Sequence, residues 1–261
     1  MSVDSLILFR EYFMEIRGKL ITGYSVADCL LFLEERAREI DSSVSSQSIA
    51  NCRGRWYELI FFAIANFYLK DKGLAFLKLG TATNHHIYDI LKNPPKEFPE
   101  NFSSNVSIPD SILVRADGDS WIKMWQDDLI MHFENPNGEL VECITSVHQT
   151  LIDEKIDHND CLAFCSLKTS LRPDRRYQPM YEAEYIKAFW IYQFGSGKFP
   201  EYIMIGQESS GKSDAILGSN LSLLSLTGTI SNRLTVDRIF IVSNLSDLES
   251  MIDKLTEALA A

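Results

Sequence analysis

The sequence has no long apolar run, few cysteines and no excess of positive charge. No run reaches the roughly 18 apolar residues of a membrane-spanning helix, so we expect no membrane segment. Its five cysteines are an odd number spread thinly over 261 residues. That spacing excludes a disulfide framework and favours a reducing, cytoplasmic setting. The net charge of -11 argues against a protein that binds nucleic acid through a generally basic surface. It leaves open a protein that confines positive charge to one cleft and uses carboxylates to hold divalent metal.

The composition that remains is that of a globular protein, 46% hydrophobic and 23% charged. With no repeat, low-complexity tract or long linker, we expect a single domain over residues 1–261, with ample length for a core. Residues 1–95 favour helices. The first residues resemble an amphipathic helix more than a secretory signal, and apolar residues recur at helical spacing between 45 and 70. A short helix is predicted over 84–92, followed by a proline-rich loop.

Residues 105–261 contain short runs of β-type residues. Strands are predicted at 111–116, 129–133, 140–144, 160–168, 202–205 and 238–243, with an Asn-Pro-Asn-Gly turn at 135–138 between two of them. Helices are predicted over 181–194 and 246–260, the second with Ser246 as its N-cap. This order predicts an α/β fold in which a central mixed sheet, flanked by helices, follows a mainly helical N-terminal region.

Three short motifs together predict a catalytic site. A Pro-Asp pair ends at Asp110, a Ser-Leu-Lys run ends a predicted strand, and an Arg-Pro-Asp-Arg-Arg run precedes Glu182 at the opening of a helix. Because side chains alternate along a strand, Ser166 and Lys168 should point the same way. A lysine at the end of a central strand is costly to bury without an anionic partner. Asp110 and Glu182 are the candidates for that partner.

Two carboxylates and a lysine are also the groups that metal-assisted phosphodiester hydrolysis needs. Carboxylates hold Mg²⁺, which prefers oxygen ligands and keeps several waters. The metal polarises the phosphoryl oxygen and lowers the pKa of an attacking water. A lysine can orient or help deprotonate that water and offset the charge that develops on the phosphate.

At these residues the sequence resembles the PD-(D/E)xK nucleases, and within them the type II restriction endonucleases that cut CCGG-centred palindromes (the NgoMIV and SgrAI group). The common nuclease pattern places an acidic residue two positions before the lysine, where this sequence has Ser166. The CCGG group shares this Ser-x-Lys on the strand and carries the displaced carboxylate on the following helix. Glu182, fourteen residues after Lys168, has the matching spacing. The run 53–58 resembles the helix on which these enzymes place a further carboxylate, which maps to Glu58.

The resemblance implies a restriction-endonuclease-like fold and Mg²⁺ as the cofactor. It implies that Asp110 and Glu182 hold the metal, Lys168 positions the attacking water and Ser166 supports the site. Glu58 would bind the metal through water or orient its ligands. The products would carry 5′-phosphates, with four-base 5′ overhangs from a cut before the first C of CCGG.

The arginine-rich run predicts a segment that recognises guanine and cytosine bases in DNA. An arginine fork pairs bidentately with guanine O6 and N7, and a carboxylate accepts from cytosine N4. Arg172, Asp174 and Arg175 therefore form a candidate DNA-reading element, four to seven residues after Lys168. A palindromic site of double-stranded DNA implies a twofold dimer, and the resemblance leaves a tetramer open.

Two other functions compete with the nuclease. Residues 206–213 match the phosphate-loop pattern G-x-x-x-x-G-K-[ST], in which Lys212 and Ser213 would bind nucleotide phosphates and Mg²⁺. Only 48 residues follow Ser213, and the later strand at 238–243 does not end in an acidic residue, so a polar loop is favoured. The other alternative is a DNA-binding module that keeps the nuclease fold without cleaving.

A zinc site is a further alternative. Cys161 and Cys165 are four residues apart on a predicted strand, so they should share one face, and His158 is near. No second ligand pair is evident, which favours two buried thiols. His85 and His86 are adjacent, point in different directions on a helix and are interpreted as structural or surface residues.

Overall fold

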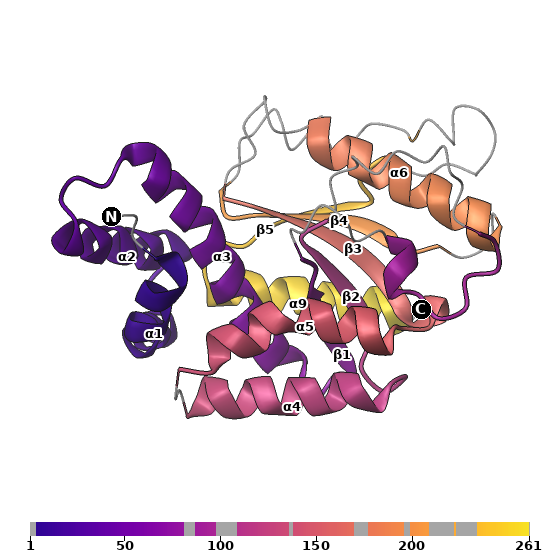
Figure 1. Ribbon diagram of the computed structural model, residues 1–261, viewed down its shortest axis with the longest axis horizontal. Coiled ribbons are helices and arrows are strands. Elements are labelled where there is room, and N and C mark those ends of the chain that lie inside the picture. Colours follow the sequence, from indigo (N-terminus) through magenta and orange to yellow (C-terminus); the bar gives the residue numbers. More distant parts are fainter. Residues whose placement is uncertain are drawn as a thin grey trace.

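The computed structural model describes residues 4–80, 87–97, 109–135, 138–169, 177–195, 199–208, 222 and 234–260. Within these ranges five strands form one sheet, with helices on both of its faces (Figure 1). The elements are α1 (Ser5–Ile21), α2 (Val26–Ile40), α3 (Ser46–Leu69), β1 (Leu74–Lys78), the 3₁₀-helix η1 (Ile87–Ile90), β2 (Ser111–Arg115), α4 (Ser120–Glu134), α5 (Leu140–Glu154), η2 (His158–Asp160), β3 (Cys161–Lys168), α6 (Tyr177–Phe194), β4 (Glu201–Gly206), β5 (Arg238–Ile241) and α9 (Leu245–Ala260). None of the helices in the described ranges is long and apolar enough to cross a membrane.

The sheet is mixed, as predicted. Its order is β1-β2-β3-β4-β5. β1, β2 and β3 pair antiparallel, whereas β3, β4 and β5 pair parallel. The start of β2 therefore lies at the same edge of the sheet as the carboxyl ends of β3 and β4. This edge brings together segments that are far apart in the sequence.

Alternating side chains of the central strands divide the core into two clusters. Along β4, Ile203 and Ile205 belong to the cluster that includes α1, α3 and α9. Tyr202 and Met204 belong to the cluster that includes α6. Figure 1 shows α6 on one side of the sheet and α9 on the other. A strand buried on both faces reads as a nearly continuous apolar run, which is why β3 and β4 were recognisable from the sequence.

Two predicted strands are wrong. Residues 129–133 lie inside α4 and residues 140–144 lie inside α5, so both predicted strands are parts of helices. The short β-type runs are parts of longer helical patterns. In α4 the buried positions include Ile122, Gln126, Leu129 and Phe133, spaced three or four residues apart. A window of five residues is too short to distinguish this period from an apolar strand.

Four smaller differences follow: one strand was missed, and three helices differ in type or in where they begin. β1 was not predicted, because its apolar run is buried on both faces and follows a long helix without a strand-like alternation. The helix predicted over 84–92 is the 3₁₀-helix η1 within the described part. Ser246 is not the N-cap of α9: it lies inside the helix, and Asn244 Oδ1 accepts from the Asp247 amide at 3.0 Å. α6 begins at Tyr177, so Glu182 lies in its second turn.

Candidate active site

Asp110 lies directly before β2, opposite the end of β3. Ser111 pairs with Cys165, so the antiparallel register brings Asp110 beside the residues that follow Cys165. Its Oδ2 atom accepts from Ser166 Oγ at 3.2 Å and from the backbone amide of Leu167 at 2.6 Å. The same oxygen accepts from Lys168 Nζ at 3.1 Å. One carboxylate oxygen thus gathers three donors from the end of β3.

The orientation of these donors follows from the pleat of β3. Ser166 and Lys168 both reach Asp110, whereas the Leu167 side chain packs in the opposite apolar cluster. The Lys168 and Asp110 side chains are only 14% and 21% exposed, so their ion pair is poorly screened by water. Lys168 has the anionic partner that its position at a strand end requires, and that partner is Asp110.

Glu182 projects from α6 and is 1% exposed. Its Oε2 atom accepts from the Tyr202 hydroxyl at 2.5 Å, and its Oε1 atom accepts from Gln178 Nε2 at 2.9 Å. Tyr202 comes from β4, the strand that pairs with β3. Burial and the neighbouring Glu182 charge raise the pKa of the Tyr202 phenol well above its ordinary value. Asp110 is thus bonded to Ser166 of β3, and Glu182 to Tyr202 of the neighbouring strand β4.

Glu58 lies on α3 and forms an ion pair with Lys78, at the end of β1. Burial raises the pKa of Glu58, and the Asp110 charge acts in the same direction. The Lys78 and Lys168 charges oppose that shift. Glu58 is therefore within electrostatic reach of the Asp110–Lys168 pair, and its direct partner is Lys78.

Lys78 and Tyr202 were not among the residues predicted from the sequence. The signal for Lys78 was a single charged residue at the end of an apolar run, but the run itself was not recognised as a strand. The signal for Tyr202 was a hydroxyl in the alternation of β4, two residues before Met204. Neither pattern is specific without the strand register that places the residue beside β2 or β3.

The proposed DNA-reading residues Arg172, Asp174 and Arg175 lie outside the described residues. The same holds for His85 and His86, and for residues 209–213 of the phosphate-loop pattern. The described part of that pattern is the end of β4 and the two residues after it.

The donors at this edge suit a hard cation. Asp110 and Glu182 supply carboxylates, and Ser166 supplies a hydroxyl beside Asp110. Within the described residues, His, Cys, Asp and Glu side chains form no group of three or more that could hold a metal. Two carboxylates are nevertheless the usual protein contribution to a Mg²⁺ site, where waters and substrate phosphate complete the octahedron. The site therefore fits Mg²⁺ better than a structural Zn²⁺, which needs a closed set of nitrogen and sulfur ligands.

The cysteines give no support to the zinc alternative. All five are buried and carry free thiols. The prediction that Cys161 and Cys165 share a face is wrong, because they belong to opposite apolar clusters. The register shifts by one residue between Leu113 and Val114, so that Leu162 is an extra residue in β3 and the alternation inverts there.

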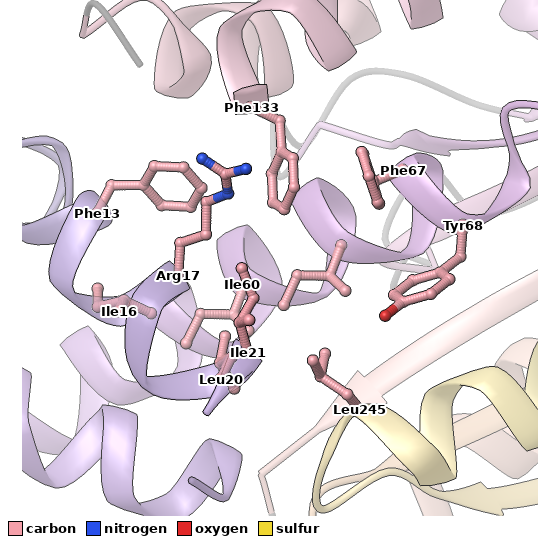
Figure 2. A pocket seen from close by; sticks show the side chains of 11 residues that line it. Phe13, Ile16, Arg17, Leu20, Ile21, Ile60, Phe67, Tyr68, Phe133 and Leu245 are labelled. Carbon is pink, nitrogen blue, oxygen red and sulfur yellow. The ribbon is translucent and has the colours of Figure 1, made fainter. Parts of the chain in front are cut away.

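An apolar pocket elsewhere in the molecule lacks catalytic groups. Figure 2 shows it among α1, α3, the end of α4 and the first residue of α9. Arg17 extends into it, and its guanidinium lies 4.9 Å from the centre of the Phe133 ring. Its lining has no carboxylate and shares no residue with the Asp110 site.

Comparison with known proteins places the whole chain among restriction enzymes. Residues 2–258 match the family model described as Cfr10I/Bse634I restriction endonuclease. The type II restriction enzyme Cfr10I of Citrobacter freundii is 24% identical over 243 residues, which cover 86% of this chain and 84% of that protein. The Bse634I restriction endonuclease has a TM-score of 0.65 at 22% identity, over 89% of this chain and 86% of that one. A crystal structure of type IIF Bse634I with cognate DNA has a TM-score of 0.64 at 20% identity, over 88% and 84%. The predicted restriction-endonuclease-like fold is confirmed.

Proposed function

The chain belongs to the Cfr10I/Bse634I restriction endonuclease family, and we propose that it is a Mg²⁺-dependent enzyme that cuts both strands of DNA at a palindrome containing CCGG. The observation that carries this proposal is the convergence on Asp110 Oδ2 of Ser166, the Leu167 amide and Lys168. A carboxylate and a lysine held together at a sheet edge, with Glu182 bonded to Tyr202 of the adjacent strand, supply the groups for phosphodiester hydrolysis.

Each residue has a distinct proposed role. Asp110 and Glu182 would hold Mg²⁺, which when bound would polarise the phosphoryl oxygen and lower the pKa of an attacking water. The Lys168 ammonium orients that water and offsets charge on the phosphate. Ser166 donates to Asp110 and holds the orientation of its carboxylate. Glu58, which forms an ion pair with Lys78, would bind the metal through water or orient its ligands. In-line attack leaves a 5′-phosphate and a 3′-hydroxyl, by resemblance with four-base 5′ overhangs.

DNA reading is assigned to Arg172, Asp174 and Arg175. Their chemistry suits G and C base edges in the major groove, and the chain reaches them shortly after Lys168, at the end of β3. Because the base-contacting residues follow the catalytic lysine closely, the position of the cut phosphate is fixed relative to the recognised base pairs. Cutting both strands of a palindrome requires two copies related by a twofold axis, as a dimer or within a tetramer. The structure of the relative Bse634I with cognate DNA supports double-stranded DNA as the substrate class.

The test is to incubate the purified protein with phage DNA and Mg²⁺ and to sequence the fragment ends. Ends that all map to CCGG with a four-base 5′ overhang are expected, and chelation of the metal should stop cleavage. Ends unrelated to CCGG would refute the specificity. Absence of cleavage, together with ATP or GTP turnover that Lys212→Ala removes, would favour the nucleotide hydrolase instead.

Two variants distinguish DNA cleavage from specific DNA binding. Lys168→Ala should abolish cleavage and leave specific DNA binding largely intact, as measured by electrophoretic mobility without Mg²⁺. Arg172→Ala should weaken specific binding by about 1–3 kcal/mol for the lost bidentate contact. Lys123→Ala is a matched control, because Lys123 is exposed on α4 and pairs only locally with Asp127. DNA binding with no cleavage by the wild-type protein would indicate a non-catalytic module.

A further inference from the structure

Two lysines end the strands on either side of Asp110. The ends of β1 and β3 both lie beside the start of β2, because β2 pairs antiparallel with each of them. Lys168 ends β3 and donates to Asp110. Lys78 ends β1 and pairs in register with Ser111. The amide of Leu79 then donates to the Asp110 carbonyl at 3.0 Å. Both neighbouring strands therefore hold Asp110, and each brings an ammonium group to this edge of the sheet.

The Lys78 ammonium is paired with Glu58 of α3. The two side chains are only 15% and 21% exposed, so water screens their attraction weakly. The ammonium also lies 5.5 Å from the centre of the Phe62 ring, whose face attracts a cation. Burial raises the pKa of Glu58, and the Asp110 and Lys168 charges both act on it. The two ion pairs therefore form one electrostatic unit of two carboxylates and two ammonium groups.

The charge of this unit matters because the chain as a whole repels DNA. Its net charge is -11, and double-stranded DNA carries about one negative charge per 1.7 Å of its axis. The carboxylates that suit a metal ion add to the repulsion at the edge where the phosphate has to lie. With both lysines in place, the two ammonium charges cancel the two carboxylate charges. Without Lys78, Glu58 would leave one negative charge uncompensated.

We propose that Lys78 is a positioning residue that acts by charge: its ammonium cancels the Glu58 carboxylate, so that a DNA phosphate can approach Asp110 and Lys168 before the metal is bound. The inference deepens the proposed nuclease function and rests on it. Lys168 does not serve both carboxylates in this arrangement, because its ammonium is bonded to Asp110. One uncompensated charge a few ångströms from a phosphate in a partly buried site should change the dissociation constant by about 3–10-fold.

The test measures the binding of a CCGG-containing duplex without metal, by fluorescence anisotropy at pH 8 and low ionic strength, where charge effects are least screened. Lys78→Met keeps a long side chain without the charge and should raise the Kd about 3–10-fold. Lys78→Arg keeps the charge and should stay within about twofold of the wild type. Lys123→Met is the matched control, because Lys123 is exposed on α4 and pairs locally with Asp127. A Kd of Lys78→Met within about twofold of the wild type would overturn the proposal.

A second pair of variants distinguishes charge compensation from structural support. Glu58→Gln alone should tighten metal-free binding, because it removes a charge that repels the phosphate. The double variant of Lys78→Met with Glu58→Gln restores the balance of charge, so its Kd should return to within about twofold of the wild type. A double variant as weak as Lys78→Met would show that the lysine acts independently of Glu58 and would overturn the proposal. Urea denaturation of each variant verifies that it is folded.

Failure of the nuclease function gives a different result from failure of this inference. A wild-type protein that binds the duplex but does not cut it with Mg²⁺ would refute the nuclease function alone, and the variant affinities would still decide the role of Lys78. A wild-type protein without affinity for duplex DNA would refute both.

Discussion

Asn66 protects the edge strand of the sheet, and its replacement should be severely destabilising. Asn66 is fully buried on α3. Its Oδ1 accepts from the Phe76 amide at 2.9 Å, and its Nδ2 donates to the Phe76 carbonyl at 2.9 Å. Nδ2 also donates to the Phe62 carbonyl at 3.0 Å. Among the described strands, β1 pairs only with β2, and the Asn66 amide satisfies both backbone groups of Phe76 on the other side.

The magnitude follows from the groups left unpaired. Asn66→Ala would leave a buried amide and a buried carbonyl of Phe76 without a partner, and each such group costs about 1–3 kcal/mol. We expect a loss of about 2–5 kcal/mol in the free energy of unfolding, after allowance for entry of water into the new space. At about 2–4 °C per kcal/mol for a protein of this size, the Tm should fall by on the order of 10 °C.

Urea denaturation and thermal melts of the variant measure this loss. The control is Asn51→Ala on the same helix, where Asn51 is exposed and accepts only from Gln47. That change should stay within about 0.5 kcal/mol of the wild type. If Asn66→Ala came within about 1 kcal/mol of the control, the pairing of Asn66 with the strand edge would not be a source of stability.

Three further predictions concern charged and nucleophilic groups. Burial raises the pKa of Glu58, and Lys78 is the largest opposing influence, so Lys78→Met should raise that pKa further. When folding raises the pKa of an acid, the protein loses stability as pH rises through that folded-state pKa. The Tm of Lys78→Met should therefore lie further below that of the wild type at pH 8 than at pH 5, and equal differences would contradict this. Lys187→Met should cost about 3–5 kcal/mol in urea denaturation because it removes the buried ammonium 3.0 Å from the Asp237 carboxylate. Adding Asp237→Asn should recover part of that cost, and a still less stable double variant would argue against the pair. Burial raises the pKa of all five thiols, for Cys29 and Cys143 to about 12. None should react with Ellman's reagent at pH 8 before unfolding, and a rapidly reacting thiol would disprove their burial.

The candidate site was partly predictable because some of its geometry is local. The period of two along an extended chain determines that Ser166 and Lys168 share a side, and this needs only the residues of β3. The same local logic failed where the window was short. The runs at 129–133 and 140–144 are apolar enough for strands, but the apolar residues around them continue with a helical period through α4 and α5. β1 was missed for the converse reason, because a strand buried on both faces has no alternation to detect.

By itself the sequence determined the residue types of the site, the face that Ser166 and Lys168 share, and the α/β class, because each depends on near neighbours in the chain. Only the tertiary structure decided that Asp110 meets Lys168, that the Tyr202 hydroxyl meets Glu182, and that Lys78 reaches Glu58. These contacts depend on which strands pair and in which register. Packing of the two apolar clusters on either side of the sheet decides that register, since a slip of one residue would exchange the buried faces of every strand.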